Sequence, residues 1–298
     1  MKSVYRISLL GLIACAGVIA LGFLWQPVTS NLEVLTNLNP LKTLVSSKTS
    51  FAVIGDNEGD NEIYRDLISQ IAADSEIKFL INLGDATATG SQAEIDELLK
   101  LHQEMNLQIP VYFVPGNHDI KADPARGIWV KNFGQKWQSL DIENLHLVLL
   151  DNADRKVGFP EEELAWLEND LVNLQKRAAV DQLTVIAYHR PFNYPLAEIV
   201  GDDETMASRK SNEKFIEILR KYPPDQIFTG HIHSSADYLM PLQKNAEGQT
   251  LKSVPVMVSG GGGQPPQSAL GGIFKAKYHF VKVEVEKQKI KTRVVPAR

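Results

Sequence analysis

The chain has 298 residues, of which 44% are hydrophobic and 22% charged, and this composition is ordinary for a globular protein with a sizeable core. The formal net charge of −5 at pH 7 argues against a nucleic-acid partner, because proteins that bind a nucleic-acid backbone usually carry a basic surplus. The single cysteine, Cys15, leaves the remainder of the chain without a disulfide, a thiolate nucleophile or a cysteine metal ligand.

Residues 1–25 are predicted to form a membrane anchor or a signal segment. The uncharged apolar run 7–25 is long enough, as a helix, nearly to span the hydrocarbon core of a bilayer. Two basic residues, Lys2 and Arg6, precede this run. By the positive-inside rule they keep the N-terminus in the cytoplasm, so the domain that follows the run lies outside it. We therefore expect a membrane-anchored, extracytoplasmic protein. Two alternatives stay open: cleavage after Ser30, which gives a secreted or periplasmic protein, and a lipoprotein signal that ends at the cysteine.

Segment 26–49 is rich in Asn, Thr, Ser and Leu, and we expect a juxtamembrane stalk there. Its leucines recur at three-residue spacing from Leu32 to Leu41, so an amphipathic stretch lying on the membrane is the alternative. Residues 50–298 then form the predicted catalytic domain. The oligomeric state is not indicated by the sequence.

Within the predicted domain, apolar strand-like runs alternate with helical patterns. The predicted strands are 51–55, 79–84, 111–115, 146–151, 185–188, 227–230, 254–259, 280–285 and 290–295. The predicted helices are 61–73, 92–105 and 160–175, and the last begins with a proline followed by three glutamates, both favourable at a helix start. The two final strands, separated by a charged turn, predict a hairpin. This order predicts an α/β layered domain with mixed sheets.

Polar motifs follow five of these strands. They are Gly55-Asp56, Gly84-Asp85, Gly116-Asn117-His118-Asp119, His189-Arg190 and Gly230-His231-Ile232-His233. Ligand sites in α/β sheets form at the carboxyl ends of strands, so these side chains should converge. Carboxylates, an amide carbonyl and imidazoles are ligands that Mn, Fe and Zn accept. Each motif alone is more often a turn, a helix cap or a satisfied core residue. Five of them in order indicate a metal site.

The order of these motifs over residues 51–295 resembles that of the calcineurin-like metallophosphoesterase superfamily. The run Glu163-Leu164-Ala165-Trp166-Leu167 and the glycine-rich turn 258–263 resemble features of superfamily members, the turn being reminiscent of the purple acid phosphatases. The resemblance implies an α/β/β/α sandwich with two mixed β-sheets flanked by helices. It also implies hydrolysis of a small phosphorylated substrate, a phosphomonoester or phosphodiester, by a hydroxide that bridges two metal ions. These ions would be divalent or mixed-valence Mn, Fe or Zn.

The resemblance also assigns roles to individual residues. The first ion would be held by Asp56, Asp85 and His233, and the second by Asp85, Asn117, His189 and His231. His118 would contact the phosphate or protonate the leaving group, and Asp119 would orient the ring of His118. Arg190 would reach a phosphate oxygen or would be only a surface cation.

The first motif departs from the family pattern, because Glu58 stands where the superfamily commonly has a metal-ligating His. Purple acid phosphatases lack that His but place a Tyr where this chain has Ala88. Four interpretations of Glu58 stay open: it is a ligand, water fills the gap, one ion only is bound, or Glu58 is an ordinary loop residue. The alternative function is therefore a metal- or phosphate-binding module of the same fold with weak or no turnover.

Substrate specificity is expected to come from the loops around the site. These loops are 86–91, 120–136, 193–212 and 260–272. Three aromatic residues, Trp129, Phe192 and Tyr194, would either stack on an aromatic leaving group or pack in the core.

Overall fold

The computed structural model describes residues 48–177, 182–192, 205–266, 277–286 and 288–298. The predicted anchor, 1–25, and all but the last two residues of the predicted stalk, 26–49, lie outside the described residues. The first strand already begins at Thr49, one residue before the predicted start of the domain. Within the described ranges, none of the helices combines the length and the apolar character that crossing a membrane requires.

Two mixed sheets lie at the centre of the described structure, as predicted. The first has the order β11 (Lys289–Pro296), β10 (His279–Glu286), β1 (Thr49–Ile54), β2 (Ile77–Asn82) and β3 (Val111–Phe113). The second has the order β4 (Gln138–Ile142), β5 (Leu145–Leu149), β6 (Leu183–Tyr188), β7 (Gln226–Thr229), β9 (Thr250–Ser259) and β8 (Ser235–Lys244). Strands β1, β2 and β3 pair in parallel, as do β5, β6, β7 and β9. The pairs β1–β10, β10–β11, β4–β5 and β8–β9 are antiparallel.

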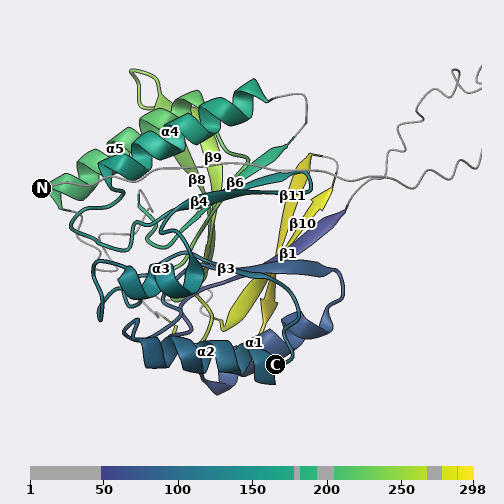
Figure 1. The fold of residues 1–298 in the computed structure, drawn as a ribbon. Helices are drawn as coiled ribbons and strands as arrows, with labels where there is room; N and C mark the ends of the chain where they lie inside the picture. Colours follow the sequence, from purple (N-terminus) through teal and green to yellow (C-terminus); the bar gives the residue numbers. More distant parts are fainter. Residues whose placement is uncertain (1–47, 178–181, 193–204, 267–276, 287) are drawn as a thin grey trace, which may run out of the picture. The chain divides into compact units, whose positions relative to one another are not determined.

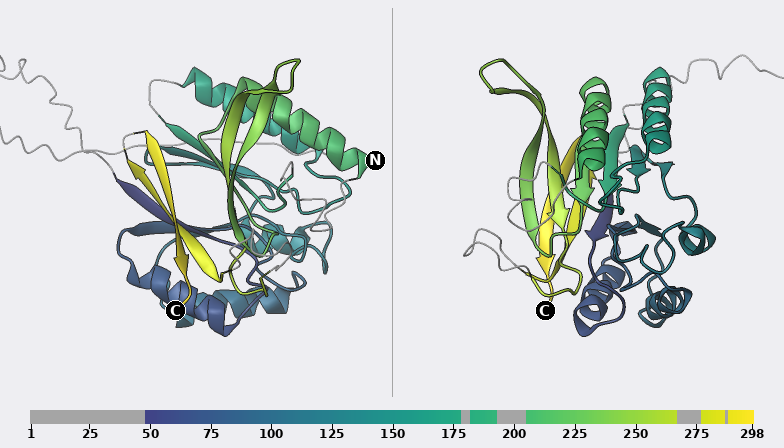
Figure 2. Two further views of the ribbon diagram at one scale, coloured as in Figure 1. Left: turned by 180° about the vertical axis from the view of Figure 1, so that it is seen from behind. Right: turned by 90° about the vertical axis from the view of Figure 1, so that its left-hand side faces the viewer.

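Helices cover the outer face of each sheet, and the inner faces pack on each other (Figure 1). The helices α1 (Glu62–Ala73), α2 (Gln92–Glu104) and α3 (Gly127–Phe133) pack beside the first sheet. The helices α4 (Glu161–Lys176) and α5 (Met206–Lys221) cover the second (Figure 2). Because both faces of each sheet are covered, the central strands are continuous apolar runs rather than alternating ones. The predicted α/β/β/α sandwich is thereby confirmed.

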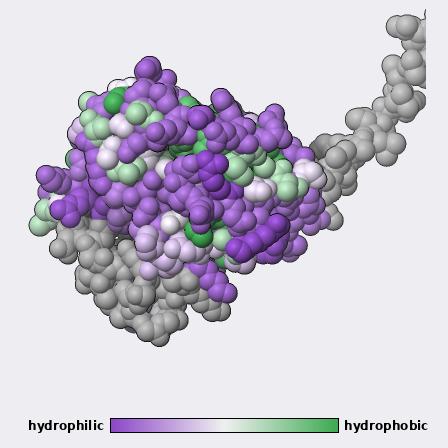
Figure 3. All heavy atoms as spheres, turned by 90° about the horizontal axis from the view of Figure 1, so that it is seen from below, coloured by the Kyte–Doolittle hydropathy of each residue, from purple (hydrophilic) through white to green (hydrophobic). Residues whose placement is uncertain are grey.

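The contact between the sheets is an aromatic and aliphatic core. Phe51 of β1 stacks on Phe79 of β2 with ring centroids 4.7 Å apart, and Phe228 of β7 meets Phe51 edge-on. On the face of the first sheet that points away from the second sheet, α1 and α2 present hydrophilic residues such as Glu62 to solvent. Figure 3, which views the molecule from that side, shows a largely hydrophilic described surface with small apolar spots.

The predicted elements are found with shifts of a few residues at their ends, and the predicted C-terminal hairpin is β10–β11. Four elements were not predicted: β4, β8, α3 and α5. Helix α3 lies within the loop expected at 120–136, and α5 begins within the loop expected at 193–212. Two of the four predicted specificity loops therefore contain helical residues.

Candidate metal centre

Three of the predicted ligands occupy left-handed backbone turns at the carboxyl ends of strands. The φ angles are +62° at Asp56, +49° at Asp85 and +67° at His231, and a glycine precedes each residue. A residue other than glycine held in this region costs on the order of 1–3 kcal/mol, and such strain concentrates at functional sites. The turns bring the backbones very close together: a Cβ on Gly116 would lie 2.0 Å from the Asp85 nitrogen. Only glycine fits there.

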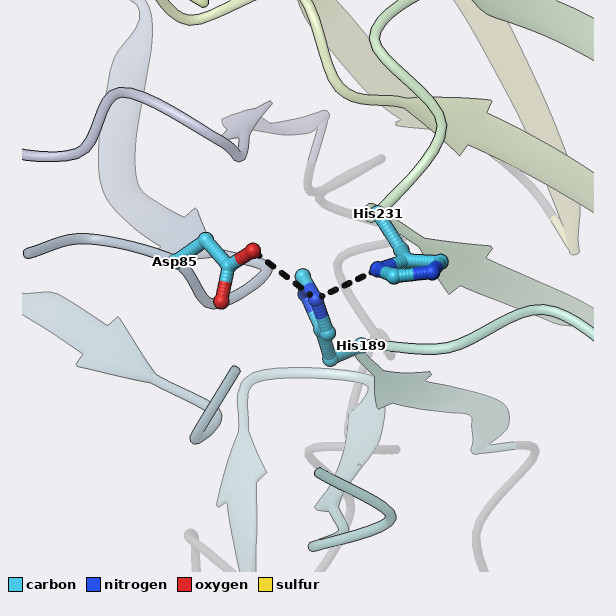
Figure 4. A group of neighbouring side chains, drawn as sticks. All are labelled: Asp85, His189 and His231. Carbon is cyan, nitrogen blue, oxygen red and sulfur yellow. Dashed lines mark hydrogen bonds and ion pairs between the residues drawn. The ribbon is translucent and has the colours of Figure 1, made fainter. Parts of the chain in front are cut away.

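Nε2 of His189 is the point on which the predicted ligands of the second ion converge. It lies 3.1 Å from Asn117 Oδ1, 3.2 Å from His231 Nδ1 and 3.3 Å from Asp85 Oδ2. Figure 4 shows Asp85 and His231 on either side of the imidazole of His189. The other ring nitrogen, Nδ1, donates to the carbonyl of Leu83 at 2.8 Å, which fixes the ring and turns Nε2 toward the cluster. The four residues thus surround one small volume with oxygen and nitrogen donors.

Asp56 and His233, which the resemblance assigns to the first ion, lie beside this cluster. Asp56 is fully buried, and its Oδ2 accepts a hydrogen bond from the backbone nitrogen of His231 at 2.9 Å. Its Oδ1 is buried and has no hydrogen-bond partner among the described residues. Nε2 of His233 lies 3.7 Å from that oxygen, and Nδ1 of the same ring donates to Pro265 O at 3.2 Å. A buried carboxylate oxygen without a partner is costly, and a metal ion satisfies it. The donor set therefore fits the ions that the resemblance implies.

The electrostatics of the cluster favour bound positive charge. Burial raises the pKa of Asp56 well above its usual range. Burial acts to lower the pKa of His189, but the Asp85 carboxylate outweighs it and the pKa is raised to about 9. Burial opposes ionisation of Asp85 too, yet His189 holds its pKa below the usual value. Desolvation lowers the pKa values of His231 and His233, which keeps both rings neutral and able to donate a lone pair to a metal.

His118 lies at the edge of the cluster. Its backbone nitrogen donates to Asp85 Oδ1 at 2.7 Å. Three groups approach Nδ1 of its ring: Lys121 Nζ at 2.8 Å, Ala88 O at 3.2 Å and Glu58 Oε1 at 3.3 Å. The bond from Glu58 is the largest cause of a raised pKa at His118. Glu58 therefore faces the site, and its nearest ionic partner is His118.

Asp119, which was expected to orient the His118 ring, makes its hydrogen bonds elsewhere in the described structure. The Asp119 carboxylate instead accepts from the backbone nitrogens of Ala86, Thr87 and Gly116 at 3.3, 2.9 and 2.9 Å. It also accepts from the Thr87 hydroxyl at 2.7 Å. Burial and the neighbouring Asp85 raise the pKa of Asp119 to about 6. The side chain turns inward because the amides of the 84–87 turn need an acceptor, and it thereby fixes the turn that carries Asp85.

Two buried asparagines hold the first two motifs together, and neither was predicted. Asn82 Nδ2 donates to Asn57 Oδ1 at 3.0 Å, and Asn57 Nδ2 donates to Ala86 O at 2.9 Å. Both side chains are fully buried. An amide side chain at the end of an apolar strand was the signal that could have found them, because it must have a partner when buried.

The glycine-rich turn supports Asp56 from the other side. The backbone nitrogen of Gly262 donates to Gly55 O at 2.8 Å, and that of Gln264 donates to Asp56 O at 3.1 Å. A Cβ on Gly260 would lie 2.2 Å from Ile232 O and 2.9 Å from Asp56 Oδ2, so a side chain there would displace the ligand. The turn is a support of the first ligand rather than a free loop.

The other residues singled out from the sequence are Arg190 and three aromatic residues. The backbone of Arg190 pairs with the side chain of Asn152 through bonds of 2.7 and 2.9 Å, and Arg190 lines a pocket together with Ser208 of α5. Trp129 and Phe192 are each 3% exposed and belong to the core, so the packing alternative holds for both. Tyr194 lies outside the described residues.

The sequence is similar to those of known proteins. The family model described as calcineurin-like phosphoesterase matches residues 49–235. A protein of Nostoc sp. named as a 3′,5′-cyclic-nucleotide phosphodiesterase is 27% identical over 164 residues, which cover 53% of this chain and 56% of that protein.

Solved structures share the fold. A purple acid phosphatase from yellow lupin superposes with a TM-score of 0.64 at 18% identity, over 84% of this chain and 52% of that one. GAP50, the anchor in the inner membrane complex of Plasmodium, gives 0.61 at 12% identity, over 84% of this chain and 85% of that one. The chain spans about half the length of the Nostoc and lupin proteins.

Proposed function

Because the chain belongs to the calcineurin-like phosphoesterase family, we propose that it hydrolyses a phosphoric ester with metal ions held by its strand-end residues. The observation that carries the proposal is the convergence of Asp85, Asn117 and His231 on Nε2 of His189. The buried, unpartnered Oδ1 of Asp56 beside His233 supports a second ion next to the first.

The two predicted ligand sets remain our assignment. One ion would be held by Asp56, Asp85 and His233, and the other by Asp85, Asn117, His189 and His231. The mixture of carboxylate, amide and imidazole donors suits Mn, Fe or Zn. When bound, such ions supply positive charge that polarises the phosphoryl group and makes water acidic enough to attack near neutral pH.

The remaining residues position this set and handle the substrate. Asp119 holds the turn that carries Asp85 through three hydrogen bonds and accepts a fourth from Gly116. His118 has Nδ1 engaged by its neighbours, which leaves Nε2 for an oxygen of the substrate. A positioned imidazole of this kind can donate to the phosphate or protonate the leaving group. We propose these roles for a small phosphorylated substrate, a monoester or a diester.

The substrate test uses the full chain, stripped of metal with a chelator. It is assayed on p-nitrophenyl phosphate, bis-p-nitrophenyl phosphate and a 3′,5′-cyclic nucleotide, the last because of the name of the Nostoc relative. Each assay is run without metal and with Mn²⁺, Zn²⁺, Fe²⁺ or Mg²⁺. Turnover restored by a metal ion and lost in Asp85→Ala supports the proposal and sorts monoester from diester. Metal binding without turnover on any of the three substrates favours the alternative, a binding module.

We further propose that residues 7–25 anchor the chain in a membrane with the catalytic unit in an extracytoplasmic space. The support is the apolar run with Lys2 and Arg6 before it. Membrane fractionation and the mass of the mature chain test this. An intact chain in the membrane fraction agrees with an anchor, whereas a chain shortened to begin after Ser30 in the soluble fraction replaces the anchor with a cleaved signal.

A further inference from the structure

The geometry points to Glu58 as the residue that positions His118 for proton transfer, the task that the resemblance assigns to Asp119. This inference rests on the proposed function and adds a role within it. Asp119 is unsuited to the task because its two oxygens are occupied by three backbone amides and the Thr87 hydroxyl. The ring of His118 therefore takes its carboxylate partner from another turn.

Glu58 is held at the required place by its backbone. Its φ angle of +46° is left-handed, and its nitrogen donates to Asp85 O at 2.8 Å. The next residue, Gly59, donates to Ala86 O at 2.8 Å. The Glu58 side chain is 15% exposed and that of His118 is 27% exposed, so the 3.3 Å pair is partly shielded from water. Shielding makes an ion pair stronger than one on an open surface.

The other two neighbours of the His118 ring cannot replace Glu58. Lys121 Nζ lies 2.8 Å from Nδ1, but an ammonium group only donates, so this contact belongs to a ring whose Nδ1 carries no proton. When Nδ1–H bonds to Glu58, the flexible Lys121 side chain must turn away. Ala88 O lies 3.2 Å from Nδ1 and can accept, but a neutral carbonyl stabilises an imidazolium less than a carboxylate does. Among the described groups around Nδ1, Glu58 is the anionic acceptor.

This arrangement directs the opposite ring nitrogen of His118 to the substrate. With Nδ1–H bonded to Glu58, Nε2–H of the imidazolium is free to approach the leaving group. As water adds to phosphorus, the bond from phosphorus to the leaving oxygen breaks and that oxygen keeps the electron pair. It takes the proton from Nε2, and the ring is left neutral with its Nδ1–H still on Glu58. Water loses one proton to solvent, so the step balances.

The competing interpretation is that Glu58 is a metal ligand. One oxygen of Glu58, one of Asp85 and a nitrogen of His118 lie within 4.8 Å of one another, which is compatible with a shared ion. The two interpretations differ in a measurable way. A ligand that is lost weakens ion binding, whereas a positioning residue acts through His118 and leaves the bound ions in place.

The test compares Glu58→Gln, His118→Asn and the double variant in the full chain reconstituted with Mn²⁺. Bound Mn²⁺ per chain is counted first. The kcat and KM values are then measured on an ester with a good leaving group, p-nitrophenol, and on one with a poor leaving group, an alkyl alcohol. The matched control is Glu62→Gln, an exposed glutamate in the first turn of α1.

We expect Glu58→Gln to bind as many Mn²⁺ ions as the wild type. On the alkyl ester its kcat should fall about tenfold or more, because a poor leaving group needs a proton, while KM changes little. On the p-nitrophenyl ester its kcat should fall by less than about threefold, since that leaving group departs without a proton. In the His118→Asn background, Glu58→Gln should cause no further loss, because the two residues act as one unit. Glu62→Gln should behave as the wild type.

Three results would overturn the inference. Loss of bound Mn²⁺ in Glu58→Gln makes Glu58 a ligand. Equal losses on both esters show a general disturbance of the site. Losses that add fully to those of His118→Asn show that Glu58 does not act through the ring. A wild-type chain that binds Mn²⁺ but hydrolyses neither ester contradicts the proposed function itself, and this outcome is distinct because it appears before any variant is compared.

Discussion

Oδ1 of Asp56 lies 3.7 Å from Nε2 of His233 and accepts no hydrogen bond from the described residues, although Asp56 is fully buried. Every other buried carboxylate oxygen of the cluster named above has a donor beside it. Burial raises the pKa of Asp56 well above its usual range, so the folded chain resists holding this carboxylate ionised by itself. A cation between the two side chains removes that penalty.

Metal ions should therefore stabilise the wild type more than Asp56→Asn, which keeps the ligands assigned to the other ion. At a free ion concentration about 100 times Kd, binding of one ion adds about 2.7 kcal/mol to the free energy of unfolding. For a domain of this size that corresponds to a rise of about 5–10 °C in the melting temperature. Differential scanning calorimetry of the stripped and Mn²⁺-loaded chain measures it. The exposed-site variant Asp237→Asn should keep the whole rise, and an equal rise in Asp56→Asn would refute the assignment.

Asp119→Asn should weaken the fold and the metal centre together. An asparagine keeps one acceptor oxygen and turns an NH₂ group toward amides that also donate. Leaving such buried amides unsatisfied costs about 1–3 kcal/mol. Urea unfolding and Mn²⁺ titration should both register the change, since the displaced turn carries Asp85. In contrast, His118→Asn should leave stability and ion binding near wild-type values. The account of Asp119 fails if Asp119→Asn, like His118→Asn, loses turnover but keeps wild-type stability and ion binding.

Gly116→Ala should abolish metal binding. The added Cβ would lie 2.0 Å from the backbone nitrogen of Asp85 and 2.2 Å from its Oδ1, so the ligand must move. Overpacking of this kind costs about 1–3 kcal/mol. The control is Gly127→Ala at the start of α3, where the new Cβ meets only the end of the Asp123 side chain at 3.1 Å. Normal Mn²⁺ affinity in Gly116→Ala would show that the turn is less closely packed than described.

His146 should make stability depend on pH away from the metal centre. Its Nδ1 lies 2.7 Å from Asp141 Oδ1 and its Nε2 lies 2.8 Å from Asp170 Oδ2, so both ring nitrogens face carboxylates. Burial acts to lower the pKa of His146, but these two partners outweigh it and the pKa is raised. The raised value means that the folded state binds the proton more tightly than the unfolded state does.

The resulting stabilisation is complete below the unfolded pKa of about 6.5 and is lost as the pH rises through the folded value. Urea unfolding of the wild type and of His146→Gln at several pH values from 6 to 9 measures the difference in unfolding free energy. The difference should shrink toward alkaline pH. The contributions of other titrating groups largely cancel because they are present in both proteins. A difference that stays constant, or grows with pH, contradicts a protonated His146.

The sequence predicted the strands that carry the site because each is a continuous apolar run followed by a polar motif. It did not predict α5. Phe215, Ile218 and Leu219 supply apolar positions only in the second half of that helix, while the first half buries Ser208, Ser211 and Asn212. Burial of Ser211 depends on a hydrogen bond from the backbone nitrogen of Phe159, a residue far away in the chain. Such tertiary partners leave no local pattern.

The direction of side chains was likewise beyond the sequence. His118 and Asp119 are neighbours, yet the ring of His118 lies at the edge of the site and Asp119 turns to the amides of the 84–87 turn. Which carboxylate meets the His118 ring is decided by the path of the turn that carries Glu58. A motif therefore predicts which residues are present in a site, whereas the packing of the surrounding loops determines which of these residues form pairs.

The measurement that tests the central claim most directly is a titration of the metal-stripped full chain with Mn²⁺. Bound ions per chain and the rate of phosphate-ester hydrolysis are followed on the same samples, for the wild type and for His189→Asn. The account predicts that the rate rises with occupancy and levels off at two ions per chain. It also predicts that His189→Asn, which removes the nitrogen on which three other donors converge, loses both binding and turnover. Hydrolysis that is independent of bound metal, or full occupancy and turnover in His189→Asn, would contradict it.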